Sequence, residues 1–571
     1  MRKTLLLFSL IGAFSTSAQE DPIFHWSKSA GNIGFDIGYG MNSDSQGNVY
    51  TVGVFNGTVD FNPGAGTSNM TAQGAAADAF VQKLDSQGNF VWAKRIGGSS
   101  GNHISHIGFA QNGDLILGGS FNETVDFDPN AGTTNLTAVP QPNPIYSSTD
   151  VSIVRLTAEG NLVWAKKIGG PGYEEILSME VDAQGNVFVA GFFELSCDFD
   201  PGVGNYSLTA TGSRDGFILK LDPDGNFVWA KRIGGASESR INKIVLDAQG
   251  NIYATGNYFQ AIDVDPNAGQ VMLQPSPPDN FNQYSQDAFV FKWNAAGEYQ
   301  WANRMAGSMS ESSYGLAVGN DVVYVSGWFY GSVDMDPGAG EAILSTSNGG
   351  SIFVCKYDTS GTFQWAKQTG AALQPEVRKI QLMEDGDLAM YGTFKGSFPF
   401  APGMTMEAQG ENDLFVARFD ADGNPEWANA FGGTGDEYPG DINIASNGVW
   451  LITGAFATTS DLNPFYPINT ATSVGSQDIF TVRLAPEALK TQDFQIDGAW
   501  SVYPNPSNGQ VSLHFDEALF GAKVDIHTIL GQKVSEYEIG QTETNLQLRP
   551  GNYIVKTQLG NSSSIKKLIV F

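Results

Sequence analysis

Residues 90–98 read Phe-Val-Trp-Ala-Lys-Arg-Ile-Gly-Gly, and residues 227–235 repeat the same nine amino acids. Related versions recur at intervals of 62 to 72 residues, each around one tryptophan: Trp26, Trp92, Trp164, Trp229, Trp301, Trp365 and Trp427. A recurring period of this length indicates a chain built from repeated structural units rather than from unrelated domains.

The unit at residues 176–234 shows what one repeat contains. Apolar stretches at 176–181, 187–193, 215–221 and 227–233 predict four strands. Turns of the Asp-x-x-Gly-Asn type join the first strand to the second and the third to the fourth, because glycine accepts a positive φ there. Four such strands, repeated about seven times, predict an all-β fold: a seven-bladed β-propeller of four-stranded antiparallel blades.

The two ends of the repeat array complement each other. The seventh unit stops after its third strand, near Leu484, whereas the chain opens with an unassigned tryptophan strand at 23–28. We expect this N-terminal strand to complete the last blade and so to pair edges that would otherwise be exposed. The tryptophans recur in every unit, which favours packing between blades over a ligand-stacking platform.

Over residues 24–485, the Asp-x-x-Gly-Asn turns followed by a tryptophan strand resemble the β-propeller repeats of bacterial secreted and surface proteins. The resemblance implies the fold but not the activity, because propellers host unrelated functions.

A second domain follows the repeats. From residue 500 onward, short alternating strands predict a small C-terminal β-sandwich. The segment resembles the type A C-terminal sorting domain of type IX secretion cargo, through Tyr503, Pro504, Asn505, Pro506, Gly509, Gly551, Lys566 and Lys567. This resemblance implies the type IX secretion machinery as a partner. It also implies a location outside the outer membrane of a Gram-negative bacterium, either anchored to the surface or released.

The N-terminus has the organisation of a secretory signal peptide. Arg2 and Lys3 precede a short apolar stretch, and Thr16-Ser17-Ala18 provides a small-residue cleavage site. No later stretch approaches the ~20 apolar residues that a membrane helix needs. The expected organisation is a signal peptide at 1–18, the propeller at 20–485, a linker at 486–499 and the sorting domain at 500–571.

The formal net charge of −29 argues against a nucleic-acid partner, because phosphate binding needs clustered lysine and arginine. An acidic surface is compatible with solubility outside the cell, with divalent cations and with basic ligands. The only two cysteines, Cys197 and Cys355, fall two blades apart, so we interpret them as buried side chains rather than as a disulfide.

An Asp-x-Asp motif recurs in the connection between the second and third strands. Alternate residues of an extended segment face the same side, so the two carboxylates of each motif converge. Such oxygens suit Ca²⁺, the one cofactor that the sequence suggests. The alternative is that they cap their own turns by accepting hydrogen bonds from nearby N–H groups. The candidate ligands are Asp126, Asp128, Asp198, Asp200, Asp263, Asp265, Asp334 and Asp336.

Two units have longer connections between their second and third strands, with extra residues at 140–146 and 275–284. Loops on a rigid scaffold commonly carry binding. Tyr146, Phe281 and Tyr284 are therefore candidate ligand-contacting residues.

Acidic residues also follow the fourth strands, at Glu174, Glu238, Glu311 and Glu437. We interpret them as solvated loop acids, although paired carboxylates there would suit glycoside cleavage. The sequence contains no nucleophile elbow, phosphate loop or dinucleotide fingerprint. It therefore favours a non-enzymatic secreted or surface module that binds a glycan or a protein. A polysaccharide hydrolase or lyase and a purely structural scaffold stay open as alternatives.

Overall fold

The computed structural model describes residues 22–571 apart from 75, 142–147, 268, 278–283, 466–467, 487–499, 517–518, 530–531 and 560–561. The expected signal peptide therefore lies outside the described residues. The chain separates into two compact units between Ala485 and Pro486. The named elements of the described residues are all β-strands, and no helix there is long and apolar enough to cross a bilayer.

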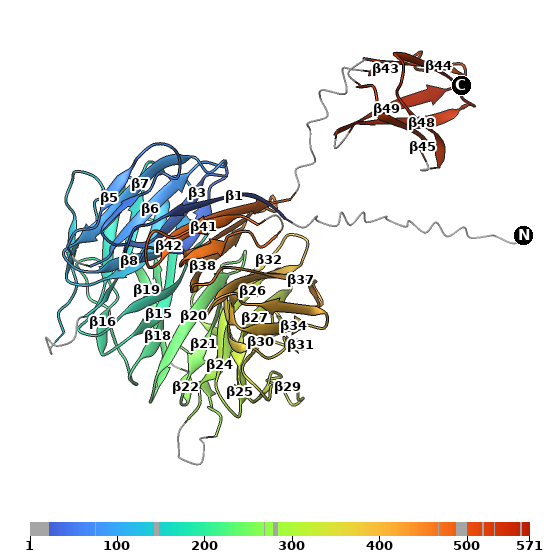
Figure 1. The fold of residues 1–571 in the computed structure, drawn as a ribbon. Helices are drawn as coiled ribbons and strands as arrows, with labels where there is room; N and C mark the ends of the chain where they lie inside the picture. Colours follow the sequence, from blue (N-terminus) through green and yellow to red (C-terminus); the bar gives the residue numbers. More distant parts are fainter. Residues whose placement is uncertain are drawn as a thin grey trace, which may run out of the picture. The chain divides into compact units, whose positions relative to one another are not determined.

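The N-terminal unit consists of antiparallel sheets that follow one another along the chain, seven within the described residues, each with four main strands; in three of them the hairpin of the next unit adds two more strands. Figure 1 shows them side by side in chain order, from blue to orange. Their strands, innermost first, are β2 (Ile37–Ser43), β3 (Val49–Phe55), β6 (Asp78–Leu84) and β7 (Phe90–Gly98); β8 (Asn102–Phe109), β9 (Leu115–Phe121), β12 (Asp150–Leu156) and β13 (Leu162–Ile168); β14 (Glu175–Val181), β15 (Val187–Phe193), β18 (Asp215–Leu221) and β19 (Phe227–Gly235); β20 (Ser239–Leu246), β21 (Ile252–Tyr258), β24 (Asp287–Trp293) and β25 (Tyr299–Gly307); β26 (Glu311–Val318), β27 (Val322–Phe329), β30 (Ser351–Asp358) and β31 (Phe363–Gln368); β32 (Leu373–Leu382), β33 (Leu388–Lys395), β36 (Asp413–Phe419) and β37 (Pro425–Phe431); and β38 (Glu437–Ile444), β39 (Trp450–Phe456), β42 (Asp478–Ala485) and β1 (Ile23–Ala30).

A short hairpin lies in each connection between the second and third strands of a sheet. The Asp-x-Asp motifs begin in these hairpins, which are β4 (Thr58–Asp60) with β5 (Asn69–Thr71), β10 (Thr124–Asp126) with β11 (Asn135–Thr137), β16 (Ser196–Asp198) with β17 (Ser207–Thr209), β22 (Ile262–Asp263) with β23 (Met272–Leu273), β28 (Ser332–Asp334) with β29 (Ile343–Ser345), β34 (Ser397–Ala401) with β35 (Met404–Glu407), and β40 (Thr459–Asp461) with β41 (Thr470–Thr472). The second to fifth hairpins carry the Asp-x-Asp motif, the first and the seventh have Asp-x-Asn instead, and the sixth, β34–β35, has neither.

The N-terminal strand completes the last sheet. β1 pairs antiparallel with β42, so that Lys28 lies opposite Thr481. Figure 1 shows the dark blue β1 beside the orange β42. Each innermost strand also contacts the innermost strand of the next sheet, and β38 contacts β2. The all-β propeller fold and its closure by the N-terminal strand are both confirmed.

The apolar cores lie between neighbouring sheets. In one cluster Ile153 of the second sheet packs with Val189 and Phe217 of the third. The second strand of a sheet is buried along its whole length, as in Val187–Phe193, because both of its faces are covered. At the second strand, neither face of a sheet is exposed to solvent, so each sheet needs a neighbour on both sides to bury its apolar residues.

The repeated tryptophans pack between sheets, as the sequence predicts. Trp164 lies against the turn glycine Gly225 of the next sheet, where an added Cβ would come within 3.2 Å of the indole ring. The same glycine has a φ of 73°, so both the turn and the close approach require it. Trp301 adds a polar contact between sheets by donating from its indole nitrogen to the Thr359 carbonyl at 3.1 Å.

The C-terminal unit is a small β-sandwich of two antiparallel sheets. Its core contains Trp500, Leu513, Ile526, Val555 and Leu568. The sheets have the strand orders β43-β44-β47 and β46-β45-β48-β49, with the bounds β43 (Trp500–Tyr503), β44 (Gln510–Phe515), β45 (Lys523–Thr528), β46 (Lys533–Glu538), β47 (Glu543–Gln547), β48 (Gly551–Leu559) and β49 (Ser562–Val570).

Deletion of residues 20–30 removes β1 and leaves β42 as an unpaired edge. We expect a loss of roughly 3 kcal/mol or more in the free energy of unfolding. Guanidinium unfolding followed by tryptophan fluorescence measures it. A truncation that starts the chain at Pro22 keeps β1 and serves as the control. Equal unfolding midpoints for the two truncated proteins would contradict the closure by β1.

Candidate functional site

Every innermost strand carries a β-bulge at the same place. In β14 the pairing with β15 skips from Ile176 to Ser178, which leaves Leu177 as the extra residue. The facing Gly191 makes this possible, because a Cβ there would lie 1.9 Å from the Glu175 carbonyl oxygen. The extra residues are Tyr39, Ser105, Leu177, Asn242, Tyr314, Arg378 and Gly440, which we call the bulge ring.

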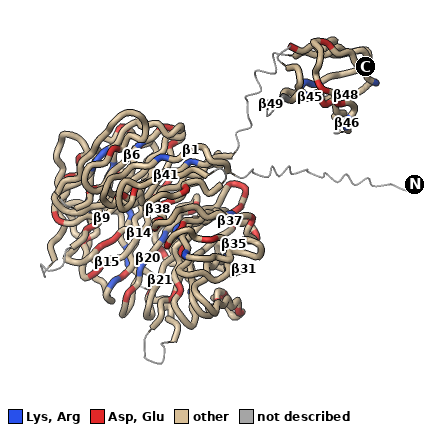
Figure 2. Tube along the Cα trace, viewed as in Figure 1, with Lys and Arg blue, Asp and Glu red and all other residues tan. Residues whose placement is uncertain are grey.

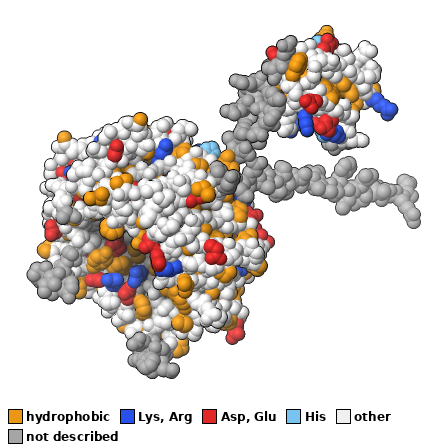
Figure 3. All heavy atoms as spheres, in the orientation of Figure 1, with side chains coloured by type: hydrophobic (Ala, Val, Ile, Leu, Met, Phe, Trp, Pro, Cys, Tyr) orange, Lys and Arg blue, Asp and Glu red, His pale blue; other side chains and the backbone are white. Residues whose placement is uncertain are grey.

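The bulge ring surrounds a cavity of about 560 Å³, and all seven of its residues line that cavity. The remaining lining comes from the same seven innermost strands, so the cavity lies where these strands meet. Its volume falls within the range of small-molecule sites, about 300–1,000 Å³. In Figure 3 basic and acidic side chains gather in a hollow of the face that is viewed. Because bulges re-aim side chains, the repeated bulge delivers one residue per sheet to this cavity.

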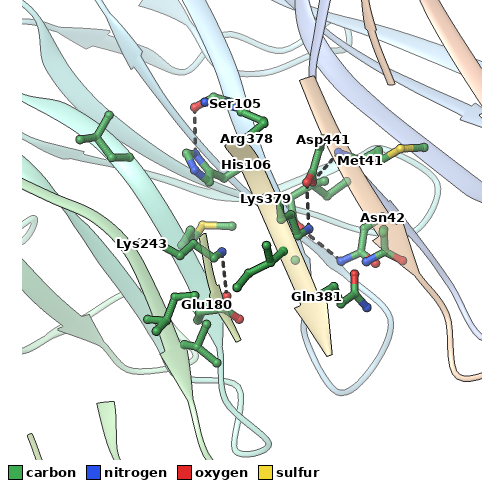
Figure 4. A pocket seen from close by; sticks show the side chains of 18 of the residues that line it. Met41, Asn42, Ser105, His106, Glu180, Lys243, Arg378, Lys379, Gln381 and Asp441 are labelled. Atoms are coloured by element: carbon green, nitrogen blue, oxygen red, sulfur yellow. Dashed lines mark hydrogen bonds and ion pairs between the residues drawn. The ribbon is translucent and has the colours of Figure 1, made fainter. Parts of the chain in front are cut away.

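Two ion pairs in the cavity wall each join neighbouring sheets. Lys243 on β20 pairs with Glu180 on β14 at 3.2 Å, and Lys379 on β32 pairs with Asp441 on β38 at 2.8 Å. Figure 4 shows the two pairs at separate places in the wall, and the dashed lines mark their contacts. All four side chains are mostly buried, so solvent screens these charges less than it screens exposed pairs.

Other polar side chains among the described residues of the wall take part in no ion pair. Within the described part of the chain, the hydroxyls of Tyr39 and Tyr314 and the amide of Asn443 make no side-chain hydrogen bond. Arg378 donates from Nε to the carbonyl oxygen of Gly440 at 2.9 Å and forms no ion pair there. These groups are available to a ligand without first breaking a contact within the protein.

The cavity differs in charge from the rest of the molecule. Its lining carries three cations (Lys243, Arg378 and Lys379) and two anions (Glu180 and Asp441), in a chain of net charge −29. Figure 2 shows basic and acidic positions close together around β14, β20 and β38. Burial, and then the nearby Lys243 and Arg378, lower the pKa of His106 in this wall to about 3. The imidazole is therefore neutral near pH 7.

Sequence reasoning did not find the bulge ring, because a bulge leaves no residue pattern of its own. One signal was nevertheless present in the repeats. This position differs between units, with Tyr, Ser, Leu, Asn, Arg or Gly, and so do the positions on either side of it, whereas the position two residues later is always Met, Ile or Leu. Variation at one fixed position of a repeated scaffold is typical of a binding surface.

The Asp-x-Asp carboxylates accept hydrogen bonds from their own turns. Oδ1 of Asp198 accepts from the N–H groups of Asp200 at 3.1 Å and Tyr206 at 2.8 Å. Oδ1 of Asp200 accepts from the N–H group of Gly202 at 2.8 Å. In the other motifs too, Oδ1 of the first aspartate accepts from the backbone N–H of the second. These pairs are Asp126 with Asp128, Asp263 with Asp265, and Asp334 with Asp336. These contacts are those of turn capping.

Calcium at these motifs stays a prediction. Among the described residues, no group of three or more histidine, cysteine, aspartate or glutamate side chains is arranged to hold a metal ion. The residue between the two aspartates is buried, as Phe127 and Phe199 show, which agrees with the alternation expected for an extended segment.

We expect Asp198→Asn to change stability little, because the amide oxygen replaces the carboxylate as acceptor. Asp198→Ala removes these two hydrogen bonds and a third one from the Asn205 amide, and should cost about 1–2 kcal/mol. If the aspartates only cap their turns, the melting temperature is the same in the presence of a chelator and in millimolar Ca²⁺. A rise with Ca²⁺ that the chelator reverses would establish the calcium site instead.

The candidate residues in the long loops are only partly visible. Tyr146 and Phe281 lie outside the described residues, and Tyr284 is half-buried. Their role in binding stays a prediction.

The sixth sheet, which lacks the Asp pair, borders a second cavity of about 550 Å³. Its walls are mostly apolar and include Phe400, Pro402, Phe419 and Pro425. The stretch Phe398-Pro399-Phe400, which replaces the Asp pair in this unit, thus contributes Pro399 and Phe400 to a mostly apolar cavity.

The expectation of solvated acids after the fourth strands is wrong for three of the four glutamates. Glu174 and Glu311 have no exposed surface and Glu437 is 2% exposed, whereas Glu238 is partly exposed and pairs with Arg240. The chain after each fourth strand folds back over the sheet instead of projecting into solvent. Glu174, for example, donates its backbone N–H to the Thr149 carbonyl at 2.9 Å.

Each buried glutamate neighbours the aspartate that begins the third strand. Burial, and then Asp287, raise the pKa of Glu311 well above its usual range. Burial and Asp150 do the same for Glu174. Burial, with a smaller contribution from Asp413, raises the pKa of Glu437 to about 8. These carboxyl groups are protonated near neutral pH and lie out of reach of a polysaccharide.

These raised pKa values predict that stability falls as pH rises. The folded protein holds protons that the unfolded chain releases above about pH 4.5, so this stabilisation is complete below pH 4.5 and is lost toward pH 8 and beyond. We expect the melting temperature to fall between pH 5 and pH 8. The triple change of Glu174, Glu311 and Glu437 to Gln should flatten that slope. Equal slopes in the two proteins would contradict the assignment, and Glu238→Gln serves as the control.

In the C-terminal unit, residues from the two ends of the domain are joined. Asn505, flanked by Pro504 and Pro506, donates from its amide to the Lys567 carbonyl at 2.6 Å and accepts from the Ile569 N–H at 3.0 Å. Lys566 donates to the Trp500 carbonyl at 2.8 Å and lies over its ring. The remaining motif residues are Tyr503, which is 70% exposed, Gly509, whose φ is 112°, and Gly551, which begins β48.

Residues 501–571 match the family model of the secretion system C-terminal sorting domain. The C-terminal unit is a type IX secretion sorting domain. The protein is therefore a secreted or cell-surface protein with a propeller-like fold.

The propeller unit has more distant relatives. The chain is 23% identical over 508 residues to an uncharacterized WD repeat-containing protein of Acanthamoeba polyphaga mimivirus, covering 76% of this chain and 36% of the relative. It is 24% identical over 330 residues to the regulatory protein FlaEY of Caulobacter vibrioides, covering 55% and 33%. The chain thus spans about a third of the length of these relatives.

Among solved structures, Sqt1 from Chaetomium thermophilum has a TM-score of 0.34 and 11% identity, covering 82% of this chain and 100% of that one. A likeness of this size carries no information about what this protein binds.

Proposed function

We propose that this secreted protein is a non-enzymatic binding module whose ligand, a glycan or a protein segment, occupies the cavity inside the bulge ring. One observation carries the proposal: seven structurally equivalent positions, one in each sheet, bring residues of six different types to one cavity. A purely structural repeat would need no such variety at equivalent positions.

The surroundings of the cavity support a preformed site. The ion pairs Glu180–Lys243 and Lys379–Asp441 fix neighbouring strands relative to each other. Asn242 adds a further link by donating to the Ser313 carbonyl at 2.9 Å. A site held by contacts between sheets loses little conformational entropy when a ligand binds.

The hydrolase alternative loses three of its four candidate carboxyl groups, and the fourth, Glu238, is paired with Arg240. Glu174, Glu311 and Glu437 are buried under the chain and touch no surface that a polysaccharide reaches. General acid–base catalysis requires a carboxyl group within hydrogen-bond reach of the glycosidic oxygen.

Asn443→Trp should fill the cavity without removing any hydrogen bond of the folded protein. We expect the purified protein to retain oligosaccharides from an array of neutral and acidic glycans, and the variant to lose them. Val228→Trp, on an exposed outer strand position, is the matched control and should bind normally. Binding that survives Asn443→Trp would place the ligand elsewhere and contradict the proposal.

A further inference from the structure

Around the bulge ring the residue types are distributed unevenly. Arg378 on β32 lies between Tyr314 on β26 and Gly440 on β38, and Tyr39 follows on β2. This part of the ring therefore holds one cation flanked by two phenol groups, with no side chain at position 440. The other part, with Ser105, Leu177 and Asn242, carries no charge.

Among the described residues, Arg378 is the cation of the cavity that forms no ion pair; burial raises the pKa of Glu376, two positions earlier, and the charge of Arg378 partly offsets that rise. Lys243 and Lys379 each have an acidic partner. The contact of Arg378 with the Gly440 carbonyl uses Nε and anchors the side chain to the neighbouring strand. Within the described residues, its two terminal nitrogens make no ion pair with a carboxylate, and they form the planar fork that carboxylates fit.

The charge balance of the wall favours an anion over a cation. Burial, and then Lys243 and Arg378, lower the pKa of His106, so this imidazole adds no positive charge to the wall near pH 7. The carboxylates of the wall, Glu180 and Asp441, are already occupied by lysines. An entering cation would find no free acid, whereas an entering anion would find a free guanidinium.

We propose that the bulge ring binds a carboxylate-bearing ligand, with the carboxylate on Arg378 and with Tyr39 and Tyr314 donating hydrogen bonds. This inference rests on the proposed binding function and names the chemical class of its ligand. The group has two sources, a small free carboxylate and a uronic acid within an acidic glycan. The volume of about 560 Å³ has room for either.

The test is calorimetric titration of the full-length purified protein with four probes: tetragalacturonate, neutral tetragalactose, free galacturonate and citrate. We expect the acidic tetramer or a free carboxylate to bind and neutral tetragalactose to bind more weakly by at least tenfold. Tighter binding of the tetramer than of the monomers identifies an acidic glycan. Tighter binding of the monomers or of citrate identifies a small carboxylate.

Two variants of the ring test the assigned contacts. Arg378→Gln should weaken the acidic ligand roughly ten- to hundredfold, because a charged hydrogen-bonded pair is lost. Tyr314→Phe removes one unpartnered hydroxyl, disturbs no contact of the folded protein, and should weaken binding severalfold. Lys231→Gln makes the same charge change on an outer strand and should leave the affinity unchanged. Melting curves report whether each variant folds.

Equal affinity for acidic and neutral tetramers overturns the anion assignment, and so does an unchanged affinity in Arg378→Gln and Tyr314→Phe. If a neutral glycan binds as tightly as the acidic one and Asn443→Trp abolishes that binding, the proposed binding function is supported. The same result excludes a carboxylate as the group that the cavity recognises. If Asn443→Trp leaves the binding of every probe intact, the cavity itself is excluded as the site.

Discussion

Each sheet of the N-terminal unit has two apolar faces, and only a neighbouring sheet covers them. Ile153 packs against Val189 and Phe217 across one such boundary, and the second strands are buried along their length. A linear stack would leave two faces exposed at its ends. The array therefore closes on itself, with β38 against β2 and with β1 as the outer strand of the last sheet. Closure in turn creates the central cavity.

The same packing brings backbone segments of the chain very close to their neighbours. Glycine recurs at these places because any larger residue would clash. Gly191 faces the bulge of β14 and Gly225 faces the ring of Trp164, and a Cβ at either place would be too close to its neighbour. The bulge is thus built into the repeat together with its facing glycine. Because the scaffold already accommodates the bulge, the bulged residue itself is free to vary, which explains how one strand pattern presents both Arg378 and Leu177 to the cavity.

Burial also changes the chemistry of the acidic residues. The chain has few basic residues, and Glu311 and Glu437 are buried beside aspartates rather than beside cations. They are kept neutral by desolvation, so they contribute to packing and to the pH dependence of stability instead of to the surface charge. The lysines and Arg378 of the cavity form a local exception in this acidic molecule.

The repeat, the four strands of each unit, the closure by residues 23–28 and the sorting domain all follow from the sequence alone. These features depend on local turns, on strand alternation and on short motifs, all of which are continuous in the chain. Turn capping by Asp198 was visible for the same reason, as an alternative to calcium. The burial of Glu174 and the shared cavity of Tyr39, Tyr314 and Arg378 are visible only once the sheets are packed together. Burial and proximity depend on how sheets far apart in sequence pack, and a bulge shifts side-chain direction without changing the residue pattern that announces a strand.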